Sequence, residues 1–206
     1  MTQRYAHTRQ CLLVALLLMG TTPLLSTAQT ARQVLDRAAA VVTAKQGAKA
    51  SFTIKGTQLN TTGTIAIKGR KFQATTPQAT VWFDGKTQWT YVNKNDEVNI
   101  TTPSAQQVNA INPYTFIYIY KDGYASSLVS GKANYEVHLT TTKQKAISEM
   151  YLLIDKKSYA PKQIRMKQKN GWTTIDISNF KQTALADGIF RFNTKDFPTA
   201  EVIDLR

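Results

Sequence analysis

Few residues of this chain have the types and spacing of a catalytic centre. The sequence holds two histidines, His7 and His138, and His7 belongs to an apolar N-terminal leader. A Ser-His-Asp triad would therefore depend on His138 alone, and no G-x-S-x-G or G-x-x-x-x-G-K-[ST] motif accompanies it. The neighbouring acids Asp96 and Glu97 are typical of a turn. Carboxylates distant in sequence can still meet in space, so a cell-envelope hydrolase stays open as a less favoured alternative.

Metal and thiol chemistry are not expected either. Cys11 is the only cysteine of the chain and lies in the leader. The mature chain would then hold His138 but no second histidine or cysteine with which to share a metal ion. We therefore expect no catalytic residues, no metal and no cofactor.

Residues 1–28 are typical of a cleaved signal peptide. Arg4 and Arg9 supply the positive region, the stretch 11–19 is apolar, and small residues end at Ala28. The apolar run is shorter than the roughly 20 residues of a membrane-spanning helix, and Pro23 follows it closely. Cleavage before Gln29 predicts export, and we expect a periplasmic protein whose single domain spans residues 29–206.

The charge of the chain is strongly basic. The sequence has 26 Lys and Arg against 13 Asp and Glu. Without Arg4 and Arg9 the mature chain keeps a net charge of about +11. The lysines are spread over many predicted strands, which indicates solvated outer faces rather than a nucleic-acid-binding tail. We expect no nucleic-acid partner, and attraction to anionic membranes is a secondary effect.

The apolar periodicity predicts one helix followed by many strands. Val34, Leu35, Ala38 and neighbouring residues recur at helical spacing, and Gly47 suits the end of the helix. After Gly47 the period changes to two. Alternation predicts strands over 50–55, 64–68, 71–75, 81–83, 87–91, 98–100, 135–139, 147–154, 163–167, 172–180 and 190–192. Asp84-Gly85 and Asn170-Gly171 are strong hairpin signals.

The segment 113–120 is the exception within this β pattern. Pro113 follows Asn112, which is typical of a helix start, and the next residues are apolar around the whole circumference of a helix. Ile and Tyr also favour strands, but the β pattern is interrupted on both sides. We predict a short apolar helix, which must either bury several of its faces at once or cover a ligand that binds and leaves.

These elements predict a mainly β fold with α structure. The expected architecture is an unclosed antiparallel β-barrel of about ten strands, with an N-terminal helix and an apolar lid helix over its mouth. Alternation assigns one face of each strand to an apolar cavity, although it does not decide which parity faces the cavity. The predicted lining residues are Phe52, Ile54, Ile65, Ile67, Phe72, Trp89, Tyr91, Phe116, Ile117 and Tyr120.

The mature chain resembles the periplasmic outer-membrane lipoprotein carriers, the LolA-like family, as a divergent member. The resemblance is carried by the signal peptide, the helix before Ala50–Lys55, the Asp84–Tyr91 turn and strand, the helix after Asn112-Pro113 and the closing Phe190–Asn193. It implies a carrier that takes a lipoprotein from an inner-membrane lipoprotein-releasing transporter, shields its acyl chains and passes it to an outer-membrane acceptor. We expect a monomer.

The resemblance also implies a latch that ties the lid shut. The family pattern has an arginine a few residues before the phenylalanine matched by Phe72. Here Lys68 occupies that position and Arg70 follows two residues later, so these two are the latch candidates. A lysine cannot make the forked contacts of arginine. A lipid- or lipoprotein-sensing scaffold with the same fold is therefore the alternative to a carrier.

Replacing Ile117 with Asp tests the lid hypothesis. A carboxylate is costly to bury without a partner, so the closed form should weaken and acyl chains should be retained less well. The fold should survive if this helix is only a lid. Binding of an apolar dye, measured beside circular dichroism, separates the outcomes. Unfolding of the whole domain would show that the helix is ordinary core.

Overall fold

Short hairpins build a large sheet from the alternating stretches. The computed structural model describes residues 29–57, 59–104 and 119–206. The described regular elements are α1 Ala31–Val42, β1 Ala48–Gly56, β2 Asn60–Lys68, β3 Lys71–Thr75, β4 Ala79–Phe83, β5 Gln88–Val92, β6 Glu97–Thr101, β7 Ala125–Ser130, β8 Asn134–Thr140, β9 Ile147–Asp155, β10 Pro161–Gln168, β11 Gly171–Gln182, η1 Asp187–Phe190, η2 Thr194–Asp196 and β12 Glu201–Asp204.

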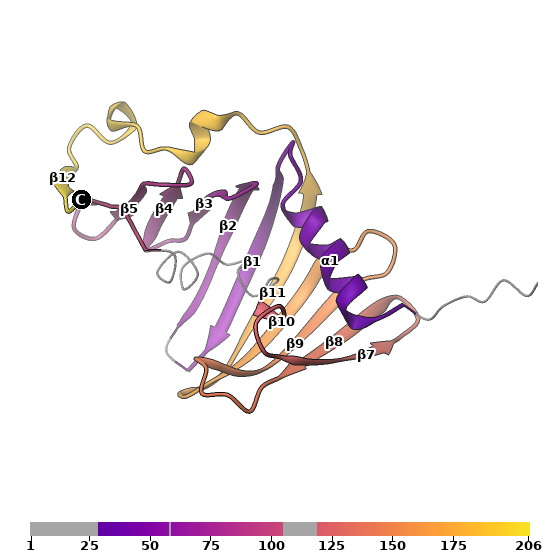
Figure 1. Cartoon of the computed structure of the whole chain (residues 1–206). Coiled ribbons are helices and arrows are strands. Elements are labelled where there is room, and N and C mark those ends of the chain that lie inside the picture. Colours follow the sequence, from indigo (N-terminus) through magenta and orange to yellow (C-terminus); the bar gives the residue numbers. More distant parts are fainter. Residues whose placement is uncertain (1–28, 58, 105–118) are drawn as a thin grey trace, which may run out of the picture.

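All twelve strands belong to one sheet, in the order β12-β6-β5-β4-β3-β2-β1-β11-β10-β9-β8-β7. Every pairing is antiparallel except that of β12 with β6, which is parallel. β12 and β7 are the two edge strands and do not pair with each other, so the sheet does not close among the described strands (Figure 1). The prediction of a mainly β, unclosed and largely antiparallel sheet is confirmed.

The strand count differs from the expected ten at two places. β7 was missed because Ser126, Ser127 and Ser130 dilute its apolar pattern, and β12 because it has only four residues. The strand predicted at 190–192 is wrong, since Phe190 ends the 3₁₀ helix η1. Its aromatic ring is fully buried, beside Ala66 and Leu185.

Both predicted hairpins, at Asp84-Gly85 and at Asn170-Gly171, are present in the structure. Gly171 has a φ of 114°, and Gln168 pairs with Gly171 across the β10–β11 turn. In the β4–β5 turn, Asp84 Oδ1 accepts hydrogen bonds from the backbone N–H groups of Lys86 and Thr87 at 3.0 and 2.9 Å. These turns fix the register of the strands that they connect.

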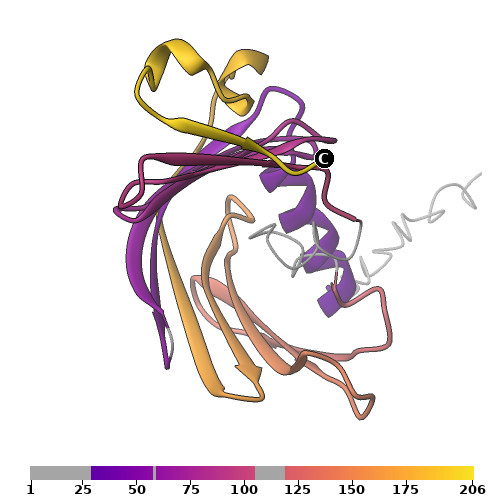
Figure 2. The ribbon, with the colours of Figure 1, turned by 90° about the vertical axis from the view of Figure 1, so that its left-hand side faces the viewer.

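Helix α1 begins with a capping box. The Thr30 hydroxyl accepts from the Gln33 backbone N–H, and the Gln33 side chain accepts from the Thr30 backbone N–H. One stripe of α1 is buried, with Val34, Leu35 and Val42 fully so. The sheet curls around this helix (Figure 2). We call the face that packs on α1 the concave face and the opposite one the convex face.

The segment 183–206 lies on the convex face and carries the chain back to the β6 edge. The rings of Phe192 and Phe197 lie 5.7 and 5.6 Å from that of Trp82, centroid to centroid. β12 then joins β6 in parallel. In Figure 2 this segment runs above the sheet, outside the curl that holds α1.

Two of the sequence predictions fall wholly or largely outside the described part of the chain. Residues 1–28 are outside it, as are residues 105–118, which contain most of the predicted lid helix with Phe116 and Ile117. Only Ile119 and Tyr120 of that segment are described. No helix among the described residues is long and apolar enough to cross a membrane.

Leu35→Ala should destabilise the fold by about 2–5 kcal/mol, because it leaves a cavity between α1 and the concave face. Leu35 is fully buried, whereas Arg32 on the same helix is exposed. The matched control Arg32→Ala should change the free energy of unfolding by less than about 0.5 kcal/mol. Urea denaturation measures both. Equal effects of the two variants would contradict the packing of α1 described above.

Candidate functional site

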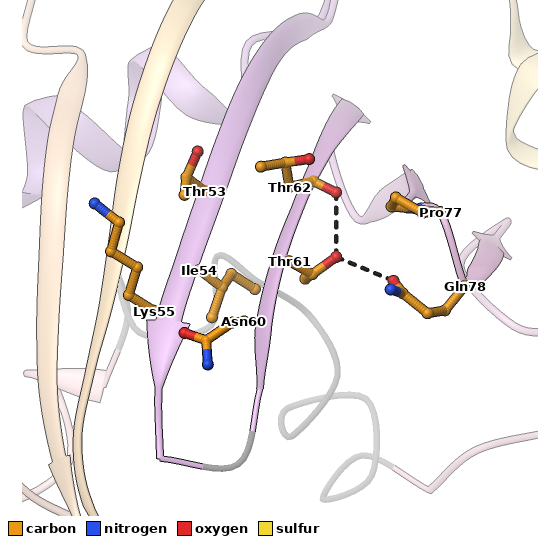
Figure 3. A pocket seen from close by; sticks show the side chains of 8 residues that line it. All are labelled: Thr53, Ile54, Lys55, Asn60, Thr61, Thr62, Pro77 and Gln78. Carbon is orange, nitrogen blue, oxygen red and sulfur yellow. Dashed lines mark hydrogen bonds between the residues drawn. The ribbon is translucent and has the colours of Figure 1, made fainter.

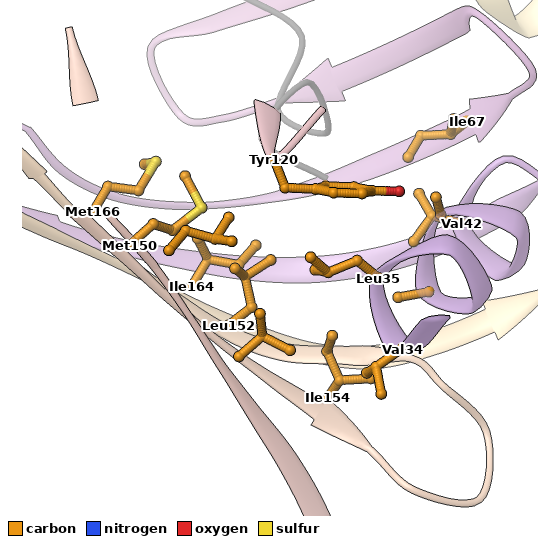
Figure 4. Packing of buried hydrophobic residues seen from close by; sticks show 14 of the residues in the cluster. Val34, Leu35, Val42, Ile67, Tyr120, Met150, Leu152, Ile154, Ile164 and Met166 are labelled. Carbon is orange, nitrogen blue, oxygen red and sulfur yellow. The ribbon is translucent and has the colours of Figure 1, made fainter. Parts of the chain in front are cut away.

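The concave face carries a continuous apolar surface. Of the predicted lining residues, Ile65, Ile67, Phe72 and Tyr120 lie on this face within the main buried cluster. The cluster also includes residues of α1 and of strands β8–β10, such as Met150 and Leu152 (Figure 4). These side chains already pack on one another, so they form the floor of the candidate site.

A second group of apolar side chains on this face stays only half-buried. Phe52 packs against the main cluster, and Ile54 pairs with Ile175, which does so too. Phe52 lies over Gly63, where an added Cβ would come within 2.5 Å of the Phe52 ring. We call this group the apolar strip; its members are Phe52, Ile54, Ala74, Val81, Ile175 and Ile177.

An open hollow lies beside the apolar strip, at the end of the sheet marked by the β1–β2 turn. Its volume is about 590 Å³, and it is wide open to solvent. Ile54 and Pro77 line it together with the three threonines Thr53, Thr61 and Thr62, and Lys55, Asn60 and Gln78 complete the wall (Figure 3). Thr61 Oγ1 donates to Gln78 Oε1 at 3.0 Å, which fastens β2 to the β3–β4 turn.

Tyr120 connects the end of the predicted lid segment to α1. Its ring is buried between α1 and the sheet, next to Ile67 and Leu35 (Figure 4). Its hydroxyl donates a hydrogen bond to Asp36, and the Lys121 ammonium group lies 3.8 Å from the same carboxylate. Helix α1 therefore holds the chain at Tyr120 and Lys121, shortly before β7.

Trp89 and Tyr91 do not face the concave side, so the inward orientation predicted for them is wrong. Trp89 lies directly opposite Trp82, and Trp82 packs on Phe192 and Phe197 of the convex face. The Tyr91 ring lies 4.5 Å from that of Phe197. Trp82 and Phe83 are adjacent apolar residues of β4 that point to opposite faces, because the segment 183–206 provides a second apolar environment on the convex face. The sequence of β4 and β5 therefore did not show which alternate residues face the concave side.

Polar residues occupy the concave positions of β5 and β6 instead. Phe83, which belongs to the main cluster, lies opposite Gln88, and Val81 lies opposite Thr90. Thr90 in turn lies opposite Asn99 of β6. These polar residues were missed in the sequence because the aromatic residues of β5 were assigned to the cavity. The aromatic pair Phe192 and Phe197 was the available sign of a convex apolar cover.

Lys68, the first latch candidate, lies on the convex face. Its ammonium group donates to the Leu185 carbonyl at 2.9 Å and pairs with Asp187 Oδ1 at 2.9 Å. Lys71 reaches the other oxygen of Asp187 at 3.1 Å. Hydrogen bonds from Lys68 and then Lys71 hold the pKa of the Asp187 carboxyl below its usual range. Lys68 thus fastens segment 183–206, on the face of the sheet opposite Tyr120.

Arg70, the second latch candidate, stands exposed in the β2–β3 turn. Among the described residues it takes part in no ion pair. The described contacts therefore give neither latch candidate a role in holding residues on the concave face.

His138 lies on the convex face and makes structural contacts. Its ring stacks on that of Tyr151 at 4.2 Å, and its Nε2 lies 2.9 Å from Glu149 Oε1. Hydrogen bonds from His138 and then Tyr151 lower the pKa of Glu149. Ser127 pairs with His138 across β7 and β8, yet no hydrogen bond joins their side chains in the described structure. No His, Cys, Asp or Glu cluster in the described ranges could hold a metal ion.

The family model for the outer membrane lipoprotein carrier protein LolA matches residues 22–170. The chain belongs to the LolA family. This match agrees with the unclosed sheet, its N-terminal helix and its apolar concave face. The LolA family consists of carrier proteins of the cell envelope rather than enzymes, and no curated protein shows significant sequence similarity to this member.

Solved structures with low sequence identity are similar to this LolA-family chain. An uncharacterized conserved protein from Thermus thermophilus is 13% identical, with a TM-score of 0.60 over 85% of this chain and 99% of that one. A LolA superfamily protein from Nitrosomonas europaea is 12% identical, with a TM-score of 0.42 over 80% and 99%. A putative outer membrane lipoprotein-sorting protein domain from Vibrio parahaemolyticus is 11% identical, with a TM-score of 0.43 over 78% and 95%.

Lys68→Met should loosen the segment 183–206 of this LolA-family protein without opening the sheet. The variant loses the contacts to Leu185 and Asp187, so backbone hydrogen exchange should speed up over 185–190 and stay unchanged in β8–β10. Arg70→Met, in the neighbouring turn, is the matched control and should leave the exchange unchanged.

The same contact should depend on pH in one direction. The pKa of Asp187 is lower in the folded than in the unfolded state. Its ion pairs with Lys68 and Lys71 therefore stabilise the fold fully above the ordinary carboxyl pKa, and this stabilisation is lost as the pH falls through the lowered folded-state pKa. Exchange over 185–190, corrected for intrinsic pH effects, should therefore rise only in acid. Unchanged exchange in Lys68→Met would contradict the fastening role.

Proposed function

We propose that this protein is a periplasmic carrier that shields the acyl chains of lipoproteins and delivers them from the inner to the outer membrane. The observation that carries the proposal is the apolar strip on the concave face of an unclosed sheet, next to an open hollow. The proposal is supported further by membership of the LolA family. A shell with one accessible apolar face is suited to cargo that water rejects.

The physical basis of carriage is burial of hydrocarbon. Each acyl CH₂ group removed from water contributes about 0.8 kcal/mol, so a chain that covers the apolar strip gains several such increments. Phe52, Ile54 and Ile175 offer area that is now half-exposed and therefore available. Because side chains without charge line this strip, chains of different length should bind with modest selection.

Delivery needs no chemical step under this proposal. An acyl chain leaves when a partner offers an apolar surface of similar or greater affinity, and a shift between empty and loaded forms must be driven by differential affinity of the cargo. The partners implied are an inner-membrane lipoprotein-releasing transporter on the loading side and an outer-membrane acceptor on the delivery side. The basic charge of the chain suits acidic surfaces on such partners.

Phe52→Asp should impair acyl binding while the fold is kept. The carboxylate would lie in the middle of the apolar strip, where a bound chain would remove it from water. We expect affinity for a fluorescent fatty-acid probe to fall about 10-fold or more. The control Ser51→Asp adds the same charge to the next residue of β1, which faces the convex side, and should bind the probe as the wild type does.

Release of lipoprotein from spheroplasts provides the functional readout. Wild type and Ser51→Asp should release lipoprotein into the soluble fraction, and Phe52→Asp should release much less. Protein purified without detergent should also carry acyl species, detectable by native mass spectrometry. Absence of both bound acyl species and lipoprotein release would refute the carrier, and recovery of a signalling protein in place of lipoprotein would favour the sensing scaffold.

A further inference from the structure

Strand β7 forms one end of the sheet, and in the described part of the chain no strand lies beside its outer edge (Figure 1). The Gly131 N–H donates to the Asn134 carbonyl across the β7–β8 turn, which sets the phase of the hydrogen-bond ladder. Successive backbone groups of a strand point to alternate sides, so the N–H and C=O groups of Ser126, Leu128 and Ser130 point away from β8. Within the described structure no hydrogen bond reaches these outward groups.

Strand β7 lacks the features that usually keep a sheet edge from pairing. Its six residues include no charged residue and no proline, and its register with β8 runs without a bulge. Five of the six are exposed, and Val129 is 63% exposed. The opposite edge strand, β12, has only four residues, two of which are Glu201 and Asp204. Charge and short length therefore protect the β12 edge, whereas the β7 edge is open to a further strand.

A hollow of about 250 Å³ lies beside the β7 edge on the convex side. Val129 belongs to this side, because it lies opposite Glu136 and the next residue of β8, Val137, is buried in the main cluster on the concave side. Val129 and Leu153 supply the apolar lining of the hollow, beside residues of the β7–β8 turn. When a strand is added to an edge, backbone hydrogen bonds give affinity, and pockets for alternate side chains give specificity.

Lysines flank both ends of β7. Before the strand, the Lys143 ammonium group lies 3.0 Å from the position that a Cβ on Gly123 would take. After it, Lys132 is exposed in the β7–β8 turn, and the Lys156 ammonium group lies 5.1 Å from the centre of the Tyr135 ring. Among the described residues, none of these three lysines takes part in an ion pair. An extended segment with acidic ends would complement them.

The acidic residues near this edge leave the excess of positive charge in place. Asp122 pairs with Lys145, and Asp155 pairs with Lys162. Glu136 lies opposite Val129, and it faces three lysines that lack an acidic partner in the described ranges.

The same charges argue against a second copy of this chain at the edge. Two β7 strands paired antiparallel about a twofold axis would bring Lys132 of one copy close to Lys143 of the other. Both copies would also carry the basic excess of the whole chain, 26 Lys and Arg against 13 Asp and Glu. Like charges would therefore meet at both ends of the shared strand pair.

We propose that the outer edge of β7 binds an extended segment of a partner protein by strand addition, and that this segment has an uncharged middle and acidic ends. The edge lies outside the apolar strip and outside the hollow at the β1–β2 turn, so this inference goes beyond the carriage of acyl chains. A partner bound at the edge would leave the apolar strip free for cargo.

A synthetic peptide tests the proposal. It has about six alternating Thr and Val residues, the usual length of a strand, and a pair of Glu residues at each end. Fluorescence anisotropy of the labelled peptide measures its binding to the whole protein. Ser126→Pro removes one outward N–H and leaves the hydrogen bonds to β8 in place, so affinity should fall about 3- to 10-fold, the worth of one net hydrogen bond.

The control Ser126→Ala keeps the backbone N–H and should bind the peptide as the wild type does. Ser130→Pro removes another outward N–H and repeats the test near the other end of β7. Circular dichroism and thermal unfolding show whether each variant is folded. All of these variants should bind the fatty-acid probe like the wild type, because none of them alters the apolar strip.

A charge exchange tests the acidic ends. Lys143→Glu should weaken binding of the Glu-ended peptide about 2- to 5-fold, as expected for an exposed ion pair. The same variant should bind a peptide with the same middle and Lys ends more tightly than the wild type does.

Two kinds of result would overturn the proposal and leave an acyl carrier intact. The first is no binding of the Glu-ended peptide to the wild type, or equal binding by the wild type and both proline variants. The second is a wild-type dimer in analytical ultracentrifugation that Ser126→Pro dissociates, since a second copy would then occupy the edge.

Discussion

The structure depends on covering the concave face of a sheet that does not close. A strongly twisted antiparallel sheet brings the apolar sides of its strands together, and an open edge leaves that surface in need of a partner. Helix α1 meets this need with the stripe that contains Val34, Leu35 and Val42. The same helix holds Tyr120, whose hydroxyl donates a hydrogen bond to Asp36.

The two halves of the sheet are covered on opposite faces. Helix α1 lies on the concave side and contacts β7 and β8, whereas the segment 183–206 lies on the convex side over β3 and β4. Phe72 and Phe83 on the concave side of β3 and β4 are still buried in the same cluster as the α1 residues. Ala74 and Val81 of the apolar strip, and Gln88, Thr90 and Asn99 beyond them, lie on the same side of β3–β6 and are only half-buried.

Elements whose conformation depends on residues close in sequence could be predicted from the sequence alone. The apolar stripe of α1 and the Asn170-Gly171 turn need only local residues, so both were predicted correctly. Which side chains of β5 face the concave side could not be predicted in this way. Its assignment depends on contacts between Trp82 and Phe197, which are far apart in the chain. Alternation gives the parity within a strand, but only the distant partner decides which side is inside.

The same limit explains the latch candidates and the polar residues on the concave side of β5. Lys68 was matched by position to a residue expected to hold a lid, yet its partner is Asp187. Nothing near Lys68 in the sequence indicates this pairing. Likewise, Gln88 and Thr90 read as the solvent side of a strand until the convex cover is known. The fold class could be inferred from the pattern alone, whereas the content of the concave surface required the tertiary contacts.

The parallel pairing of β12 with β6 has a consequence for the order of assembly. β4, β5 and β6 lie in the first half of the chain, but the residues that cover their aromatic convex face and pair with β6 come after β11. During folding, Trp82, Trp89 and Tyr91 therefore lack this cover until the segment after β11 is in place. An uncovered strand edge beside exposed aromatic rings is prone to intermolecular pairing. Assembly of this sheet is completed from its outside, after the concave surface that would hold a ligand has taken shape.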